Sequence, residues 1–263
     1  MRRLVARSAS LALLALAANA CSDAGPSPSS SSQFSFNLAT QAGPAASRGT
    51  AFGVVGTPET FTDGTNTLVI SKVELVVREI ELHRAGATAD CSSGASGDCE
   101  ELEFGPLLVD LPLGAPGAAR NFSVQLAPGT YDKLELKIHT PSSSRDDDAS
   151  FVQQHPDLAG VSVRVTGTYN NGPEFTYTGN LEAEMEFELN PALTASETGA
   201  TDLTLFVNLD SWFRGTGSAL IDPLTANPGQ PNESLVEQNI RNSLEAFEDE
   251  DHDGRDDHGS AHP

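Results

Sequence analysis

The chain has 263 residues, with 37 acidic and 15 basic side chains and a formal net charge of -22 at pH 7. A surface of this sign repels nucleic-acid phosphates and anionic lipid headgroups, so neither is expected as an electrostatic partner. Because the chain has only three lysines, divalent cations are its natural counterions. The length suits one large β domain or two small ones.

Residues 1–20, MRRLVARSASLALLALAANA, have the pattern of an export signal. Three arginines are followed by an apolar run that is too short to cross a membrane as a mature helix. The ending AANAC resembles a bacterial lipobox, with Ala18 where leucine is usual. This resemblance implies that the Cys21 thiol is acylated and anchors the protein to the bacterial outer membrane, with Ser22 as the sorting residue. The alternative is an ordinary signal peptide cut near Ala20, which leaves Cys21 as a free thiol.

Removal of the signal would leave 12 basic and 37 acidic residues, a net charge of -25. An anionic bilayer would repel such a protein, so the lipid on Cys21 would have to supply the attachment. Residues 21–50 are rich in Ser, Pro, Ala and Gly and are predicted to form a flexible tether. Phe34 and Phe36 interrupt this tether and indicate a short edge strand.

Residues 51–225 are predicted to form the folded domain, because apolar and polar residues alternate repeatedly between turn signals. The clearest strand is APGTYDKLELKI at 127–138, with one buried and one solvent-exposed face. LVISKVELVVREIELHR at 68–84 alternates and then shifts register before Ile80, which predicts two strand halves joined at a bulge. Further strands are expected at NFSVQL, VSVRVTGTY, EFTYTGNLEAEMEFEL and TDLTLFVNLDSWF. The predicted fold is an all-β, antiparallel β-sandwich of the transthyretin-like or Ig-like kind; a partly open barrel is the alternative.

Cys91 and Cys99 flank the small polar loop SSGASGD. In an oxidising envelope this spacing predicts a disulfide that contributes roughly 2 to 3 kcal/mol by loop closure. The competing interpretation is a metal-binding pair of thiols, although zinc sites usually space their cysteines more closely.

The segments KVELVVREIELHR, LLVDLPLG and VQLAPGTYDKLELKIHTPS resemble an uncharacterised family of bacterial envelope lipoproteins, a domain of unknown function. The resemblance covers approximately residues 50–225 and includes a Leu-x-Pro-Gly-x-Tyr pattern at Leu126, Pro128, Gly129 and Tyr131. It implies a β-sandwich in the cell envelope and no particular activity. A tyrosine at such a corner is expected to bury its ring and to donate its hydroxyl to a backbone carbonyl.

Four glutamates, Glu182, Glu184, Glu186 and Glu188, alternate with apolar residues. On a strand they share one face, with neighbours about 7 Å apart. This face is either a binding surface for cations or a solvated edge that resists aggregation. The acidic stretch RDDDAS at 145–150 raises the same choice, and a solvated loop suffices to explain it.

Catalytic motifs are missing from the sequence: His83, His139 and His155 are scattered, and no GxSxG, HExxH or phosphate-binding glycine loop occurs. The predicted function is therefore a non-catalytic binding or structural role in the envelope, with a polysaccharide or an envelope protein as partner. The alternative is a periplasmic glycan hydrolase that uses paired carboxylates. Trp212 is a candidate sugar platform, but burial beside Phe213 is the competing expectation.

Residues 226–248 are predicted to be a linker and the one C-terminal α-helix. SLVEQNIRNSLEAF begins with a capping box of Ser234 and Glu237. Its apolar residues fall on one helical face over 234–247: Val236, Ile240, Leu244 and Phe247.

Residues 249–263 form an acidic tail that resembles the loop of an EF-hand and thrombospondin-type calcium repeats. The expected Ca²⁺ ligands at alternate positions are Asp249, Asp251, Asp253, the Arg255 carbonyl and Asp257. Ser260 stands where an EF-hand has glutamate, so binding is predicted to be weak, about 0.1 to 1 mM. Two alternatives remain: a zinc or nickel site at His252, His258 and His262, and a disordered acidic terminus that binds no metal.

Overall fold

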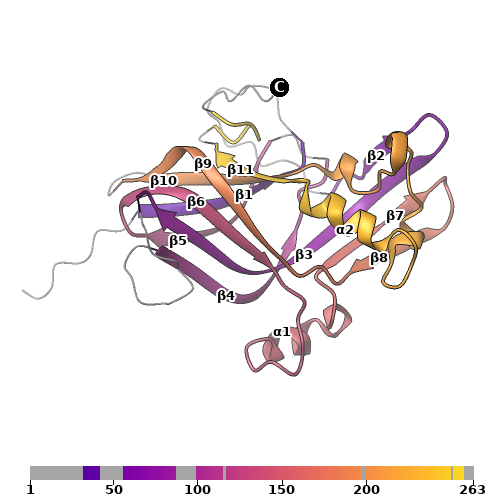
Figure 1. Cartoon of the computed structure of the whole chain (residues 1–263), viewed down its shortest axis with the longest axis horizontal. Helices are drawn as coiled ribbons and strands as arrows, with labels where there is room; N and C mark the ends of the chain where they lie inside the picture. Colours follow the sequence, from indigo (N-terminus) through magenta and orange to yellow (C-terminus); the bar gives the residue numbers. More distant parts are fainter. Residues whose placement is uncertain are drawn as a thin grey trace, which may run out of the picture.

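The protein is described by a computed structural model, in which all the described strands belong to two sheets (Figure 1). The described residues are 32–41, 56–86, 99–114, 117–196, 200–249 and 251–257. The predicted signal, Cys21, Cys91 and residues 258–263 lie outside these ranges. Cys99 is the first residue of a strand, but the predicted disulfide lies outside the described residues because its partner does.

The larger sheet has seven strands in the order β8-β7-β3-β6-β9, with β2 and β4 also paired to β3. Their bounds are β2 Glu59–Thr62, β3 Thr67–Arg84, β4 Cys99–Asp110, β6 Gly129–Ile138, β7 Val163–Tyr169, β8 Glu174–Gly179 and β9 Ala183–Ala195. All pairs in this sheet are antiparallel.

The smaller sheet has four strands in the order β11-β10-β1-β5. Their bounds are β1 Ser32–Ala39, β5 Ala119–Leu126, β10 Ala200–Val207 and β11 Leu244–Glu248. Its β1–β10 pair is parallel, and the other two pairs are antiparallel. The predicted β-sandwich is thus confirmed, with one parallel pair.

The helical elements are short, and they connect strands. The α-helices are α1 Ala149–Gln154 and α2 Glu233–Arg241; the 3₁₀ helices are Pro156–Leu158, Leu209–Ser211, Thr216–Ser218 and Pro223–Ala226. Within the described part of the chain, no helix has the length and apolar character needed to cross a membrane.

A single large core lies between the sheets and contains the inward-facing residues of both. Tyr131 and Trp212 are fully buried there. The Tyr131 hydroxyl donates to the Ala127 carbonyl at 2.7 Å, which confirms the predicted tyrosine corner. Trp212 donates its indole N–H to Ser243 Oγ at 2.7 Å. Trp212 is therefore a core residue and offers no exposed platform to a sugar.

The long strand β3 confirms the predicted bulge. Its register shifts between Val77 and Glu79 in the pairings with both β4 and β6. The shift keeps Ile80 in the core although Val77 is buried three residues earlier. The prediction of one wet face on β6 was wrong at Glu135, which is buried between its neighbours.

Strand β1 corrects the predicted tether. Phe34 and Phe36 are at most 1% exposed, and the strand lies between β10 and β5. Residues 32–39 therefore form an inner strand, not a flexible segment or an edge. The physical reason is that β1 pairs with β10 on one side and with β5 on the other. Both partners lie far away in the sequence, so the residues around β1 do not reveal them.

The predicted helix over 234–247 was also partly wrong. Helix α2 ends at Arg241, and Leu244–Glu248 forms β11 on the outer side of β10. Val236 and Ile240 are buried as expected. The helix begins at Glu233, and its N-cap Asn232 makes no side-chain capping bond, so the capping box at Ser234 was wrong as well. Apolar residues spaced four apart fit a helix or a strand. Here Leu244–Glu248 forms a strand because it pairs with the side of β10 that β1 does not occupy.

Candidate calcium loop and the adjoining groove

Asp249 organises the loop that follows β11. The residue is fully buried, and its Oδ2 accepts hydrogen bonds from Thr204 Oγ1 at 2.9 Å and from the Gly254 amide at 3.0 Å. Its Oδ1 accepts from the Asp253 amide at 3.0 Å. One carboxylate thus ties the loop to β10. Gly254 has a φ of 77°, a conformation that glycine adopts without strain.

Three of the predicted ligands converge at this loop. Asp249, Asp251 and Asp257 each offer a carboxylate oxygen, and these oxygens lie within 4.8 Å of one another. Asp253 is not a member of this group, and the Arg255 carbonyl stays a predicted ligand. Instead, the Asp253 amide donates to Asp251 Oδ1 at 3.1 Å, and Asp253 Oδ2 lies 3.5 Å from the Arg255 guanidinium.

Asp253 has one further feature that bears on a ligand. Its side chain is 7% exposed, and its Oδ1 is buried without a hydrogen-bond partner among the described residues. A buried acceptor of this kind is rare in folded proteins and commonly accompanies a water or an ion. The loop therefore contains three converging carboxylates and one further buried oxygen.

Burial raises the pKa of Asp249 to about 6. The negative charge of Asp257 raises the pKa further, whereas hydrogen bonds from Thr204 and Gly254 and the charge of His252 lower it. A carboxylate that is costly to ionise gains most from a cation placed beside it. This donor set of hard oxygens fits Ca²⁺ or Mg²⁺ rather than a soft metal.

The alternative histidine site at this terminus is only partly described. His252 lies with its Nε2 4.0 Å from Asp202 Oδ1, which is too long for a hydrogen bond. His258 and His262 lie outside the described residues. The zinc or nickel hypothesis therefore stays a prediction.

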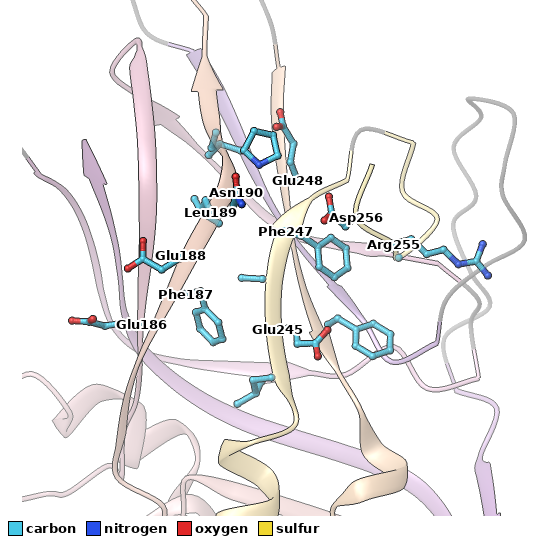
Figure 2. A pocket seen from close by; sticks show the side chains of 16 residues that line it. Glu186, Phe187, Glu188, Leu189, Asn190, Glu245, Phe247, Glu248, Arg255 and Asp256 are labelled. Carbon is cyan, nitrogen blue, oxygen red and sulfur yellow. The ribbon is translucent and has the colours of Figure 1, made fainter. Parts of the chain in front are cut away.

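A groove of about 710 Å³ opens beside this loop, between β9 and β11 (Figure 2). One side comes from Glu186–Pro191 and Leu193 of β9, and the other from Leu244–Glu248 of β11 with Phe206 of β10. Gly254, Arg255 and Asp256 of this acidic loop contribute to its wall. The groove and the loop are thus one continuous surface.

The glutamates of β9 share one exposed face, as predicted. Glu186 lies 3.4 Å from Lys133 of the neighbouring strand, and Glu182 accepts a hydrogen bond from the Thr140 amide. Glu186 and Glu188 also line the groove. The sequence identified this face, but not the groove beside it.

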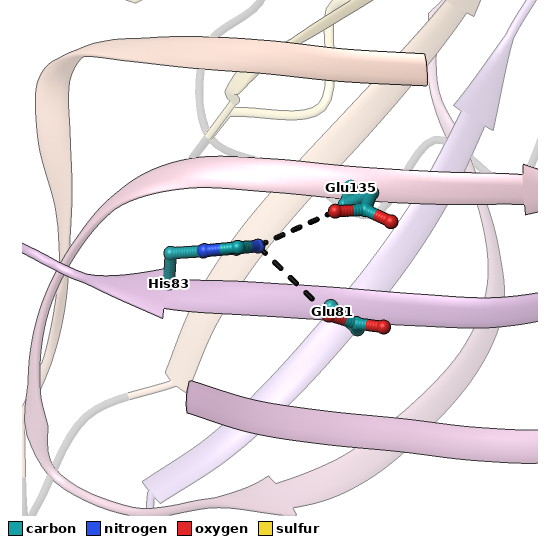
Figure 3. A group of neighbouring side chains, drawn as sticks. All are labelled: Glu81, His83 and Glu135. Atoms are coloured by element: carbon teal, nitrogen blue, oxygen red, sulfur yellow. Dashed lines mark ion pairs between the residues drawn. The ribbon is translucent and has the colours of Figure 1, made fainter. Parts of the chain in front are cut away.

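A second group of metal-ligating side chains lies on β3 and β6 (Figure 3). His83 Nε2 lies 3.6 Å from Glu135 Oε2 and 3.9 Å from Glu81 Oε2. Glu81 and Glu135 are register partners on adjacent strands, and both are buried. One imidazole and two carboxylates form a donor set that suits Zn²⁺ or Mn²⁺ better than Ca²⁺.

Lys137 already balances part of the charge of this group. Its ammonium lies 2.8 Å from Glu81, 3.2 Å from Glu135 and 3.1 Å from Glu79. Burial and the charge of Glu81 raise the pKa of Glu135, while Lys137 opposes the rise. Burial lowers the pKa of Lys137, but the three carboxylates outweigh it and raise the pKa overall. Since internal ion pairs suffice to explain this group, we assign no metal to it.

The stretch 145–150 is exposed except for Asp148, which forms a buried anchor that the sequence did not predict. Asp148 is fully buried, and its carboxylate lies 2.9 Å from His139 Nε2 and 3.3 Å from Arg78 Nη1. Burial opposes ionisation, yet the hydrogen bonds from His139 and the Ser142 amide lower the pKa of Asp148. The contacts hold the start of α1 against the sheet. His139 carried the only sequence signal, as an unassigned histidine.

Comparisons with protein-family models, with curated proteins and with solved structures found no match. The resemblance to envelope lipoproteins therefore stays a prediction.

Proposed function

We propose that this chain is a lipid-anchored, calcium-binding protein of the bacterial cell envelope with a non-catalytic binding role. The predicted export signal supports a location in the cell envelope, and Cys21 supports the lipid anchor. The acidic loop supports the proposal that a cation binds, and the groove beside it supports the proposal of a binding role. The expected partner is another envelope component, a protein or a polysaccharide.

The single observation that carries the calcium proposal is the convergence of the Asp251 and Asp257 carboxylates on the buried carboxylate of Asp249. Without a cation, the two less buried aspartates repel Asp249 at short range. Calcium would replace this repulsion with shared coordination, and the Asp253 Oδ1 would be a further oxygen donor.

Calcium would also act on the groove. Gly254, Arg255 and Asp256 belong to the acidic loop and also line the groove. A cation that draws the aspartates together would fix this wall in one conformation. The ion is thus proposed as a brace for a binding surface and not as a catalyst.

The experiment is a calorimetric titration of the mature protein in detergent with CaCl₂. Wild type should bind with a dissociation constant of roughly 0.1 to 1 mM, the range of extracellular calcium modules. Asp251→Asn combined with Asp257→Asn should weaken binding at least tenfold. Asp256→Asn is the control for charge, because it removes one carboxylate from the same loop outside the converging group and is compared with each single variant of the pair.

Equal calcium binding by the double variant and by wild type would reject this loop as the site. Equal weakening in Asp256→Asn would mean that bulk charge, and not coordination, attracts the ion.

A glycan hydrolase is the alternative that the sequence leaves open. We favour a binding role because Glu186, Glu188 and Glu245 stand exposed at the groove. A general acid for glycoside cleavage usually needs an apolar environment that keeps it protonated.

A further inference from the structure

We infer that Asn37 of β1 is a further ligand of the proposed calcium site, so that the bound ion joins the acidic loop to β1. This inference rests on the proposed function and adds to it a ligand from a distant part of the sequence. The Asn37 side chain is 0% exposed, and neither its Oδ1 nor its Nδ2 has a hydrogen-bond partner among the described residues. A buried amide of this kind is rare in folded proteins and indicates a bound water or ion.

Asn37 lies on the face of the smaller sheet that the acidic loop contacts. Phe36 and Leu38 point into the core between the sheets, so Asn37 points to the opposite face. Thr204 of β10 is the register partner of Asn37, and its hydroxyl donates to Asp249 Oδ2 at 2.9 Å. Because side chains of register partners stand next to each other on the same face, the Asn37 amide neighbours the group that binds Asp249.

The path of the loop places it over β1. At its start, the Asp249 amide donates a hydrogen bond to the Asp202 carbonyl of β10. Further along, the His252 carbonyl accepts a hydrogen bond at 2.9 Å from the amide of Ala118, the residue before β5. Since β1 lies between β10 and β5 in the sheet, a loop held at both of these strands crosses β1. This crossing explains why Asn37 is fully buried on the outer face of the sheet.

The loop brings an unpartnered oxygen of its own to the same contact. Asp253 directly follows His252, and its amide donates to Asp249 Oδ1 at 3.0 Å. The Asp253 Oδ1 is buried and has no hydrogen-bond partner within the described part of the chain. The strand and the loop that crosses it thus each contribute a buried oxygen that nothing in the fold satisfies. A divalent cation held between Asn37 and the aspartates would satisfy both oxygens.

The coordination chemistry of calcium leaves room for this ligand. Ca²⁺ takes about six to eight oxygens, which include the side-chain carbonyl of asparagine. An EF-hand completes its site with a bidentate glutamate, and this chain has Ser260 at that position. An oxygen from β1 would replace part of what the loop lacks. Because asparagine is neutral, it would coordinate the ion without adding to the repulsion among the converging aspartates.

The test compares Asn37→Leu with wild type, using the mature protein in detergent. Leucine has the same branched shape as asparagine and no polar atoms. Calorimetric titration with CaCl₂ should show binding weakened about tenfold, because a ligand of the ion is lost. In a chelator, the variant should melt at a higher temperature than wild type, because a buried amide without partners is removed. A purely structural asparagine would show the second effect without the first.

Tyr177→Phe is the control for the effect on melting. The Tyr177 hydroxyl is also buried without a hydrogen-bond partner among the described residues, but it lies on β8 of the larger sheet. Its removal should shift the melting temperature equally in calcium and in chelator. Calcium affinity should change less than about twofold, because the two sites share no partner.

Asn37→Asp tests the ligand in a second way and carries the test if Asn37→Leu does not fold. This variant keeps the oxygen and adds a charge, so it should bind calcium more tightly than wild type. Ser35→Asp is the control for charge, because it adds the same carboxylate to the same face of β1, about 7 Å away. Ser35→Asp should tighten calcium binding less than Asn37→Asp does.

The luminescence lifetime of bound Eu³⁺, a hard cation that replaces calcium at oxygen sites, reports the water molecules in its coordination sphere. Asn37→Leu should add a coordinated water, because water takes the place of the lost amide oxygen. Tyr177→Phe should leave this hydration unchanged.

Three outcomes would overturn the inference: calcium affinity of Asn37→Leu equal to that of wild type, equal tightening by Asn37→Asp and Ser35→Asp, or unchanged Eu³⁺ hydration in Asn37→Leu. The first of these would mean that Asn37 holds a water and no ion. If wild type binds no calcium, the proposed function fails together with this inference. If Asn37→Leu keeps the calcium binding that Asp251→Asn with Asp257→Asn loses, the Asn37 ligand alone is rejected.

Discussion

Asp249 is the residue on which the calcium proposal depends most. It is fully buried, its carboxylate holds the loop together, and its pKa is raised to about 6 from an ordinary value of 3.8. The sequence predicted Asp249, Asp251 and Asp257 as ligands because alternate carboxylates and a glycine follow one another. It also predicted Asp253, whose carboxylate the structure leaves out of the converging group, and the Arg255 carbonyl, which stays a prediction. Their placement depends on the path of the loop against β10, which spacing alone does not reveal.

The raised pKa of Asp249 predicts a pH dependence with a definite sign. The folded protein holds this proton up to about pH 6, whereas the unfolded chain releases it near 3.8. Without calcium, the contribution of Asp249 to stability is therefore present below about pH 4 and is lost as the pH rises through 6. Its size is on the order of 2 to 3 kcal/mol. The affinity for calcium should show the opposite trend. Calcium should bind more weakly below pH 6, because a proton competes with it for the Asp249 carboxylate.

The measurement is chemical unfolding between pH 4 and 7 in a chelator, with wild type and Asp249→Asn side by side. The difference between the two proteins isolates this residue from the other acids. The same pH slope in both proteins would contradict the assignment.

At the scale of elements, the sequence was most informative where the alternation of side chains was long. The strands at 68–84 and 127–138 were predicted with their bulge and their turn, because a long period-two pattern is typical of a strand with one buried face. Strand β11 was missed, and β1 was predicted only as a short edge strand within a tether, whereas it is an inner strand. β1 is short and lies in a stretch rich in small polar residues, and the residues of β11 also fit a helical period. In both cases the deciding factor is a partner strand that lies far away in the sequence.

The inner position of β1 predicts a large effect of a core substitution there. Phe36→Ala should cost roughly 3 to 5 kcal/mol of unfolding free energy, because it leaves a cavity between the sheets. Gln33→Ala, at an exposed position on β1 itself, is the control and should change stability by less than about 0.5 kcal/mol. Denaturant unfolding measures both. If Phe36→Ala proved as mild as the control, β1 would be a tether after all.

At the scale of the whole molecule, the groove emerges from the order of strands in two sheets. β9 ends at Ala195 and β11 begins only at Leu244, yet the two strands border one opening. No local pattern in the sequence predicts this meeting, whereas the acidic loop can be predicted because its residues are contiguous. The same reasoning explains why the buried His139–Asp148 contact went unpredicted although its residues lie nine positions apart.

The proposed anchor is also tested on the whole molecule. Mass spectrometry of the native N-terminal peptide should find an acylated Cys21, and Cys21→Ser should move the protein from the membrane fraction to the soluble fraction. The anchoring follows from the apolar gain of several acyl chains, which exceeds what one chain provides. An uncut leader, or a bare thiol on a soluble protein, would contradict the proposal.

The central position of β1 has a mechanical consequence. If Cys21 carries the lipid, about ten residues separate it from β1, and they span roughly 35 Å at full extension. Any pull between the bilayer and a captured partner would then enter the fold through a strand that is hydrogen-bonded along both sides. Such a load acts along the ladder in shear, where many bonds must break together, so the attachment would resist force far better than one that peels an edge strand.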